Sequence, residues 1–455
     1  MSKKIAQILL MGGLVLSLAA CGTGQKTKIV PSPVQTLVVA NTPEAGDLVI
    51  SNTSTFVDKY GSYRVVGMLV NKTNNVLTGI KLTLEILDAS GNSLLKENGN
   101  PVPGVIFHPM LKTLAPGEGS PFEYSYDTAN GVPASYKVTI TALQSGDTKR
   151  ANLTAENVQI VDNGSGWYYL TGDLVNKGTQ WARIHNLAGA ILDASNNVLS
   201  ADQTVTYTTE LAPAGDPSGS DRTPFEINFP NPGGSGTPNW NLYWDTDVID
   251  NANLYPVATN ITNGYIDQYG AQHIVGWVTN RSNQSLTSLV VAGLYDQAGI
   301  ALDASNSNLA IPLKAGEAIP FSISTFGNVD NNPAQAAQVR TFTVQVDPGN
   351  TIPPNYEFAE LASSGETIQK DGATWTINGS VTNTSNQKLS SATVVVAVMD
   401  AQNNLVAMES TAIFSSGDAI DAGETDPYSV SIYLDPSIDA SDFTTATTVI
   451  GEIRK

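Results

Sequence analysis

Cysteine, histidine and charged side chains are scarce in this 455-residue sequence. The single cysteine, Cys21, excludes an internal disulfide, so folded parts must be held together by burial and strand pairing alone. The three histidines, His108, His185 and His273, have no spacing that suits a metal site. Only 14% of the residues are charged, and the net charge of −19 disfavours binding to nucleic acid.

Sequence motifs that carry catalysis are also missing. No glycine-rich phosphate loop leads from a strand into a helix, and no Ser/His/Asp arrangement stands out. No long stretch shows helical periodicity, whereas Val and Thr occur throughout and Gly, Pro and Asn are abundant, as in all-β proteins. We therefore expect a β-rich protein that is not an enzyme.

The first residues have the pattern of an export signal. Lys3 and Lys4 precede an apolar segment, 5–18, which at about 14 residues is too short to span a hydrocarbon core of about 30 Å. The letters LAAC at 18–21 then resemble the lipobox of bacterial lipoproteins. The resemblance implies cleavage before Cys21, a thioether-linked diacylglycerol on its sulfur, and often a third, palmitate-like acyl chain on its amine.

A lipidated N-terminus would anchor the protein without a membrane-spanning helix. Two or three acyl chains hold a protein stably on a membrane, and no later stretch is apolar enough to span one. We expect residues 1–20 to be a signal peptide and residues 21–47, which contain several Gly and Pro, to be a flexible tether. The mature protein is then predicted to be extracytoplasmic and lipid-anchored to a bacterial membrane or cell envelope.

A seven-residue motif, which we call the repeated word, occurs four times after this tether, as VVGMLVN, LTGDLVN, IVGWVTN and INGSVTN. Its glycines are 105, 104 and 103 residues apart, which is the length of a domain rather than of a solenoid repeat. In chain order the recurring glycine, asparagine, aspartate and proline of each copy are Gly67, Asn71, Asp88 and Pro121; Gly172, Asn176, Asp193 and Pro224; Gly276, Asn280, Asp296 and Pro320; Gly379, Asn383, Asp400 and Pro427.

The repeated word alternates as a β-strand does. In the fourth copy Trp375, Ile377 and Val381 share one parity, and the other parity is polar. This pattern predicts strands with one face on a core and one face in solvent. The glycine falls on the apolar face, where it is predicted to let an aromatic ring or the opposing sheet approach closely.

The recurring asparagine and aspartate are predicted to form turns. Asparagine side chains bond to nearby backbone and tolerate left-handed conformations, which suits the connection after each repeated strand. Each aspartate opens a hairpin turn, spelled DASGN, DASNN, DQAGI and DAQNN. A turn-forming role is the simpler prediction for these aspartates than a ligand-binding one.

The fold class follows from this repetition. About seven short strands per roughly 100 residues, antiparallel in pattern, predict an immunoglobulin-like sandwich. The word VxGxVxN followed by LYD at 294–296 resembles the bacterial FxLYD family, although ILD or VMD replaces LYD in the other copies. The resemblance implies an immunoglobulin/fibronectin-like fold found in extracytoplasmic proteins and lipoproteins, without an assigned chemistry.

We therefore predict an all-β chain of four tandem immunoglobulin-like antiparallel β-sandwich domains. The predicted bounds are 48–148, 149–257, 258–348 and 355–455, with residues 347–355 as a linker before the fourth domain. The second domain is expected to carry an enlarged Gly/Pro/Trp-rich loop at 230–245.

Two stretches could bind a ligand. The aromatic residues of the expected loop, Trp240, Tyr243 and Trp244, either fold back as a local core or face a glycan or peptide partner. The acidic stretch 415–429 offers hard oxygen ligands for calcium, although its spacing is not that of an EF-hand and a solvated loop is the alternative. Its carboxylates are Asp418, Asp421, Glu424 and Asp426. No other cofactor is expected.

The leading functional hypothesis is a non-enzymatic surface lipoprotein whose repeated domains serve as a spacer, a scaffold or an adhesion surface for an envelope protein or glycan. The alternative is an extracytoplasmic carbohydrate- or peptide-binding protein that uses the aromatic loop of the second domain. Repetition of the unit without a retained polar cluster favours the first hypothesis, because a catalytic site needs asymmetric chemistry.

Overall fold

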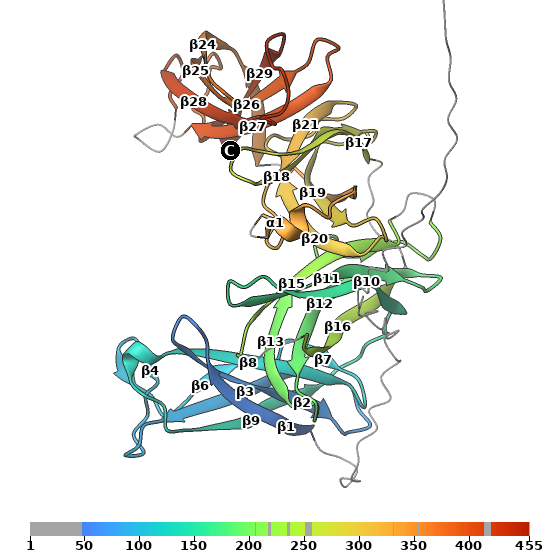
Figure 1. The fold of residues 1–455 in the computed structure, drawn as a ribbon, viewed down its shortest axis with the longest axis vertical. Helices are drawn as coiled ribbons and strands as arrows, with labels where there is room; N and C mark the ends of the chain where they lie inside the picture. Colours follow the sequence, from blue (N-terminus) through green and yellow to red (C-terminus); the bar gives the residue numbers. More distant parts are fainter. Residues whose placement is uncertain are drawn as a thin grey trace, which may run out of the picture. The chain divides into compact units, whose positions relative to one another are not determined.

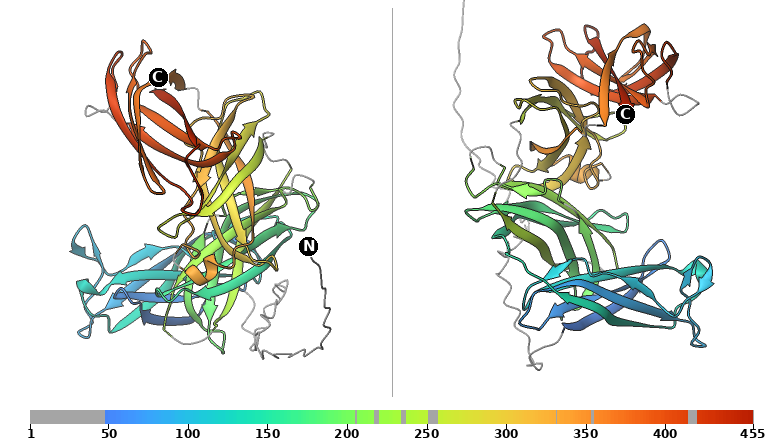
Figure 2. Two further views of the ribbon diagram at one scale, coloured as in Figure 1. Left: turned by 45° about the horizontal axis from the view of Figure 1, so that its top comes forward. Right: turned by 180° about the vertical axis from the view of Figure 1, so that it is seen from behind.

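The computed structural model describes residues 48–204, 206–216, 220–233, 237–250, 257–330, 332–352, 355–413 and 420–454. Nearly all elements within these ranges are β-strands, so the predicted all-β sandwich class is confirmed (Figures 1 and 2). The exceptions are a 3-10 helix at Thr128–Asn130 and one short helix, α1 (Pro333–Ala336). In the described part of the chain, no helix is long and apolar enough to cross a membrane.

The strands form four pairs of antiparallel sheets in chain order, which we call modules 1 to 4 (Figure 1). The first sheet of each module has three strands and carries the repeated word at its centre. In chain order, the first sheets are β1 (Leu48–Val57), β2 (Ser62–Asn71) and β8 (Gly119–Asp127); β10 (Leu153–Asp162), β11 (Trp167–Asn176) and β15 (Arg222–Pro230); β17 (Val257–Ile266), β18 (Gln272–Asn280) and β21 (Ala318–Ile323); β24 (Ser363–Asp371), β25 (Thr374–Thr382) and β28 (Thr425–Tyr433).

The second sheet of each module is built around the strand that precedes the recurring aspartate. The second sheets are β3 (Leu77–Leu87) with β6 (Val105–Phe107), β7 (Thr113–Leu114) and β9 (Ser135–Ser145); β12 (Trp181–Leu192) with β13 (Val198–Thr204), β14 (Glu210–Leu211) and β16 (Asn239–Ile249); β19 (Leu286–Tyr295) with β20 (Ala301–Asn308) and β22 (Thr341–Thr351); β26 (Ser391–Met399) with β23 (Tyr356–Leu361), β27 (Leu405–Ile413) and β29 (Thr444–Arg454). A small hairpin of β4 (Lys96–Glu97) and β5 (Asn100–Pro101) is added in module 1.

The recurring glycine lies opposite the recurring aromatic residue across the first sheet. Gly67 pairs with Phe122, and a Cβ on this glycine would lie 2.5 Å from Cζ of that ring. The same pairing joins Gly172 to Phe225, and a Cβ there would lie 2.8 Å from the ring. The other two copies repeat this arrangement with Phe321 and Tyr428. The predicted steric role of the glycine is therefore confirmed, since any larger residue would displace a buried ring.

The recurring asparagine is buried and bonds both to its own turn and to a carbonyl of the segment that returns from the second sheet. In module 4, Nδ2 of Asn383 donates to the carbonyls of Gln387 (2.8 Å) and Ile420 (3.0 Å), and Oδ1 accepts from the N–H of Ser385 (3.0 Å). The other three copies make the same set of contacts. The predicted turn role is confirmed, and the side chain also holds this turn against the opposite sheet.

The recurring aspartate forms the predicted hairpin turn in every copy. Oδ1 of Asp193 accepts from the backbone N–H groups of Ser195 (2.7 Å) and Asn197 (2.8 Å), and the other three aspartates repeat this pattern. The third residue after each aspartate has a positive φ, such as 63° at Asn196, which explains why Gly or Asn stands there.

Two expectations about loops are wrong. The predicted linker 347–355 begins inside β22, whose pairing with β19 continues to Thr351. The predicted loop 230–245 includes the first half of β16, which pairs with β12 along its length. In both places Gly and Pro in the sequence suggested a loop, but backbone pairing with a buried neighbouring strand extends the sheet. The bounds of the four domains remain a prediction.

Replacement of Asn383 by alanine is expected to lower the free energy of unfolding by about 2 kcal/mol, because the buried bond to the carbonyl of Ile420 and the partly buried bond to that of Gln387 are lost. The exposed Asn386 of the same turn is the matched control, and Asn386→Ala should change stability by less than about 0.5 kcal/mol. Urea denaturation measures both variants. Equal effects would contradict a bridging role for the buried asparagine.

Candidate functional site

The strand that carries the repeated word is covered on its second face in modules 1 to 3. In β2 the second-face side chains Val66, Met68 and Val70 are at most 8% exposed. The corresponding side chains are Tyr169, Thr171, Asp173 and Val175 in β11, and His273, Val275, Trp277 and Thr279 in β18. The expectation that this face meets solvent is therefore wrong for the first two copies, and in the third copy for His273 and Val275, because the next module covers them.

Each covered face packs against an edge strand of the following module. The first sheet of module 1 contacts β13, that of module 2 contacts β20, and that of module 3 contacts β27 (Figure 1). These three strands lie at the edge of their own second sheets, where unpaired backbone groups would otherwise favour aggregation. The same elements thus meet three times, and we call these contacts junctions 1/2, 2/3 and 3/4.

A polar side chain of the first sheet bonds to a carbonyl at the start of the edge strand in all three junctions. Ser54 donates to the carbonyl of Val198 in junction 1/2. Thr171 donates to the carbonyl of Ala301 at 2.6 Å in junction 2/3. In junction 3/4, Nδ2 of Asn263 donates to Val406 at 3.1 Å. The repetition of this contact shows that the junctions are equivalent.

Apolar burial also crosses the junctions. Val66, Met68 and Val70 belong to a hydrophobic cluster that includes Ala188, Ala190, Val198, Ala201 and Tyr243 of module 2. A second continuous cluster joins modules 3 and 4. Burial of each Val or Met side chain contributes about 1.5–3 kcal/mol, so separation of two modules would be costly. The described residues belong to a single compact unit.

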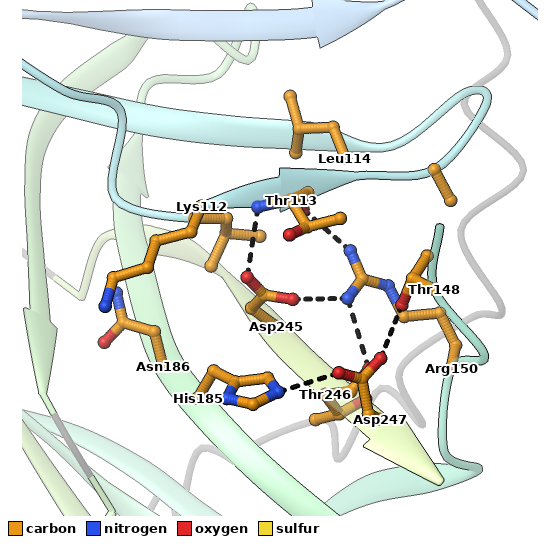
Figure 3. A network of polar contacts seen from close by, with 12 residues as sticks. Lys112, Thr113, Leu114, Thr148, Arg150, His185, Asn186, Asp245, Thr246 and Asp247 are labelled. Atoms are coloured by element: carbon orange, nitrogen blue, oxygen red, sulfur yellow. Dashed lines mark hydrogen bonds and ion pairs between the residues drawn. The ribbon is translucent and has the colours of Figure 1, made fainter. Parts of the chain in front are cut away.

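Arg150 connects modules 1 and 2 through a buried polar network (Figure 3). Its guanidinium donates to Glu118 (Nη2–Oε2 2.6 Å) and to the carbonyl of Thr113 (2.7 Å), and it pairs with Asp245 of β16. Asp245 is 2% exposed and also accepts from the N–H of Thr113 at 3.1 Å. Burial opposes the charge on Arg150, but these two carboxylates still raise its pKa above the ordinary value.

Beside this network, His185 bonds to Asp247 in an arrangement that only partly resembles a catalytic triad (Figure 3). Nε2 of His185 lies 2.8 Å from Oδ2 of Asp247, and the hydroxyl of Thr148 donates to Oδ1 at 2.8 Å. A triad needs the hydroxyl on the imidazole, whereas here it bonds to the carboxylate. Burial alone would raise the pKa of Asp247, but the bonds from His185 and Thr148 hold it below its ordinary value. His185, Asp247 and Thr148 therefore make structural contacts rather than a catalytic triad.

Acidic side chains are buried in each junction, with different partners. In junction 1/2, Arg64 of β2 pairs with Glu123 of β8, which also accepts from the N–H of Ala201 at 3.2 Å. Burial raises the pKa of Glu123 to about 7, although Arg64 beside it favours the carboxylate. Burial also raises the pKa of Asp202 in β13 to about 6.

Junctions 2/3 and 3/4 bury acids in other settings. Junction 2/3 holds Glu226 of β15 against Asp303 of β20. In junction 3/4, burial raises the pKa of Glu409 in β27, and His273 of β18 opposes this shift. His273 itself bonds to Asp267 at 3.0 Å. Arg64 therefore lies beside the acid of the first junction, and the imidazole of His273 lies near the acid of the third.

Module 4 differs from the others at the equivalent face. In β25 the second-face side chains are polar and half-buried, namely Thr376, Asn378, Ser380 and Thr382. Module 1 differs at the edge strand, since β6 has only three residues and the hairpin of β4 and β5 precedes it. Polar outer faces of this kind are typical of terminal repeats in an array.

The candidate aromatic site does not form a shared platform. Trp240, Tyr243 and Trp244 lie on β16 rather than in a loop. Trp240 and Trp244 pack against the core of module 2, whereas Tyr243, 9% exposed, joins the cluster at junction 1/2. Their side chains thus serve two different packing faces, and only parts of the two indoles remain accessible.

The candidate calcium residues are only partly described. Asp418 lies outside the described residues, and Asp421 pairs with Lys388 at 3.2 Å. The carboxylate of Glu424 caps the turn by accepting from the N–H of Asp421 at 2.7 Å, and Oδ2 of Asp426 is buried with no hydrogen-bond partner among the described residues. Among the residues that the structure describes, no group of three or more His, Cys, Asp or Glu side chains could hold a metal ion.

A cavity of about 510 Å³ adjoins Trp375 of module 4 and Gln268 of module 3. The indole of Trp375 is 1% exposed and lies under Lys370, whose Nζ is 3.8 Å from the ring centroid, so a ligand could not stack on it. Asp435 in the same wall bonds to its own turn at Ser437. The cavity therefore lacks polar groups that converge on one ligand.

The sequence contained a signal for the junctions that the expectations above did not use. In the first copy the second parity of the repeated word reads Val66, Met68 and Val70, which is as apolar as the core parity. A strand that is apolar on both faces must be buried on both. The second parity is polar throughout only in the fourth copy.

Comparisons with known proteins give no functional information. No family model and no curated protein matches the sequence. Among solved structures, a β-glucuronidase from glycoside hydrolase family 2 is 10% identical with a TM-score of 0.11, covering 58% of this chain and 25% of that one. The native conformation of E. coli alpha-2-macroglobulin is 7% identical with a TM-score of 0.13, covering 88% and 28%. The chain thus spans about a quarter of the length of each of these proteins, and TM-scores this low do not indicate a shared fold.

Replacement of Arg150 by alanine is expected to lower the free energy of unfolding by about 3 kcal/mol, because it leaves the buried carboxylate of Asp245 without its cation. Arg183, which pairs with Glu210 at the surface of module 2, is the matched control. Arg183→Ala should cost less than about 1 kcal/mol. Urea denaturation near neutral pH compares the two, and similar losses would show that Arg150 does not join the modules.

Proposed function

We propose that this protein is a non-enzymatic, lipid-anchored spacer or scaffold outside the bacterial cytoplasm. The observation that carries the proposal is the use of one contact at three successive junctions, each joining the first sheet of one module to the edge strand of the next. Such junctions hold neighbouring modules in fixed contact, as a spacer requires. A chain of independent binding domains would not need them.

The chemistry of the described residues supports the same proposal. The His–Asp pairs and the buried carboxyl groups make structural contacts within modules or at junctions. A binding protein usually presents a few polar groups that converge in an apolar pocket. The cavity beside Trp375 lacks this convergence, and the aromatic residues of β16 are largely used in packing. These observations favour a scaffold over a glycan- or peptide-binding protein.

The anchor is proposed from the sequence alone. The LAAC motif and the apolar segment before it belong to residues 1–47, outside the described part of the chain. Acylation at Cys21 would tie the module array to a membrane, with an envelope protein or a glycan as the partner held at a distance from it.

Replacement of Cys21 by serine is expected to move the protein from the membrane fraction to the soluble extracytoplasmic fraction of a bacterial host, because the acyl chains are lost. Mass spectrometry of the native chain should find a diacylglycerol on Cys21. Ser17→Ala, a neutral change in the same segment, is the control and should leave fractionation unchanged. An unmodified thiol on the membrane-associated protein would refute the anchor.

Fixed junctions are tested by distances between spin labels on the Cys21→Ser chain. Cysteines placed at exposed, equivalent turn positions, such as Asn74, Thr179 and Asn283, report on neighbouring modules. We expect narrow distance distributions for both neighbouring pairs. Broad distributions would contradict a scaffold with fixed modules, whatever the result for lipidation.

A further inference from the structure

Junction 2/3 buries two carboxyl groups against one another. Glu226 of β15 is 8% exposed and Asp303 of β20 is fully buried. Strands β15 and β20 are in contact, and the two carboxyl groups lie close enough that each shifts the pKa of the other. Two carboxylates buried this close together repel one another, so a proton on one of them is favoured.

The surroundings indicate which group is ionised. Asp303 accepts three backbone N–H bonds, from Ala304 (2.7 Å) and Asn328 (2.9 Å) and from Val329 (2.7 Å), which stabilise a carboxylate. Glu226 has fewer donors, namely the side chain of Asn228 and the backbone N–H of Asn328, and among the described residues its Oε2 has no hydrogen-bond partner. A proton on Glu226 would turn this buried oxygen into a donor toward Asp303.

No cation neutralises the pair. Among the described residues, neither Glu226 nor Asp303 forms an ion pair with a basic side chain. The nearby base Arg222 lies 3.8 Å from Asp173 instead, and Asp173 also accepts from Tyr295 of module 3 at 2.7 Å.

The remaining titratable groups around the pair are neutral or engaged elsewhere. Tyr169 of β11 and Tyr207 face the two carboxyls, and burial raises the pKa of both phenols, so they stay neutral. Asp330, in the loop that follows Asn328, accepts from the backbone N–H groups of Gln272 and Phe326. Only a proton can therefore compensate the second negative charge.

We propose that a proton shared by Glu226 and Asp303 holds junction 2/3 together, and that loss of this proton as the pH rises loosens this junction selectively. Ionisation of both groups places two like charges in a buried site, and the junction can relieve their repulsion only by opening to water. The contact between modules 2 and 3 would then stay closed at acidic pH. At alkaline pH it would open, and modules 1 and 2 could move relative to modules 3 and 4.

The direction of the pH effect follows from proton binding. Burial, together with the negative charge of Asp303, raises the pKa of Glu226 well above its ordinary value. The closed junction therefore binds more protons than the open one, so it is stable below the ordinary carboxyl pKa and weakens as the pH rises through the raised pKa. Each unit by which the pKa is raised corresponds to about a tenfold change in the opening equilibrium.

The other junctions provide a built-in comparison. At junction 1/2, Arg64 pairs with Glu123, and at junction 3/4, His273 lies near Glu409. Ionised Glu123 forms an ion pair with Arg64, which offsets its repulsion by Asp202, whereas among the described residues no cation pairs with the carboxyls of junction 2/3. Junction 1/2 should therefore open less with rising pH than junction 2/3.

Hydrogen exchange of the full chain from about pH 5 to about pH 9, corrected for the intrinsic exchange rate, tests the proposal. Amides of β20 and of residues 326–330 should exchange at least about tenfold faster at the high end in the native chain. Glu226→Gln keeps a donor toward Asp303 but cannot ionise, so it should abolish this increase. Glu123→Gln, at junction 1/2, is the matched control and should leave it unchanged.

A flat pH response in the native chain, or the same response in Glu226→Gln, would overturn the proposal. A second measurement needs no change at the pair. Infrared spectra of the Glu123→Gln chain should retain the band of a protonated carboxyl at neutral pH, where ordinary carboxyls are ionised. Absence of that band in the folded protein would overturn the shared proton even if Glu226→Gln does not fold.

Discussion

The packing of one sheet face against the edge strand of the next module is the contact on which the rest of this structure depends. It buries the second face of the repeated strand, as with Met68 and Val70 in module 1, and it covers edge strands that would otherwise invite aggregation. It also brings carboxyl groups such as Asp303 out of water, and so creates the raised carboxyl pKa values at the junctions. A chain without disulfides within its modules gains cohesion from burial that extends beyond each module.

Within a module, the sequence was sufficient to predict the repeated turns and the close approach of a ring, although not the full length of β16 and β22. The spacing of Gly67 and its three counterparts predicted the repeat, and its position on the apolar parity predicted the close approach of a ring. The turn roles of Asn71 and Asp88, with their counterparts, followed from the hydrogen-bonding capacity of short polar side chains. These interactions are local or join neighbouring strands, so residue type and spacing determine them.

Between modules, the sequence was informative only in part. The apolar second parity of Val66, Met68 and Val70 signals a covered face, but it does not say which element covers it. The pairing of Arg150 with Asp245 joins residues 95 positions apart, and that of Glu226 with Asp303 also crosses a module boundary. The aromatic residues of β16 misled the expectation of a loop because Gly and Pro precede them, while backbone pairing with β12 decided their conformation.

The differing chemistry of the junctions has an evolutionary consequence. The repeated units are alike in sequence, but the side chains at their junctions differ. Arg64 pairs with Glu123 at junction 1/2, whereas Glu226 lies against Asp303 at junction 2/3. Exchanging two units would set a lone charge against an apolar or acidic surface. The copies are therefore no longer interchangeable, and their order along the chain is itself inherited information.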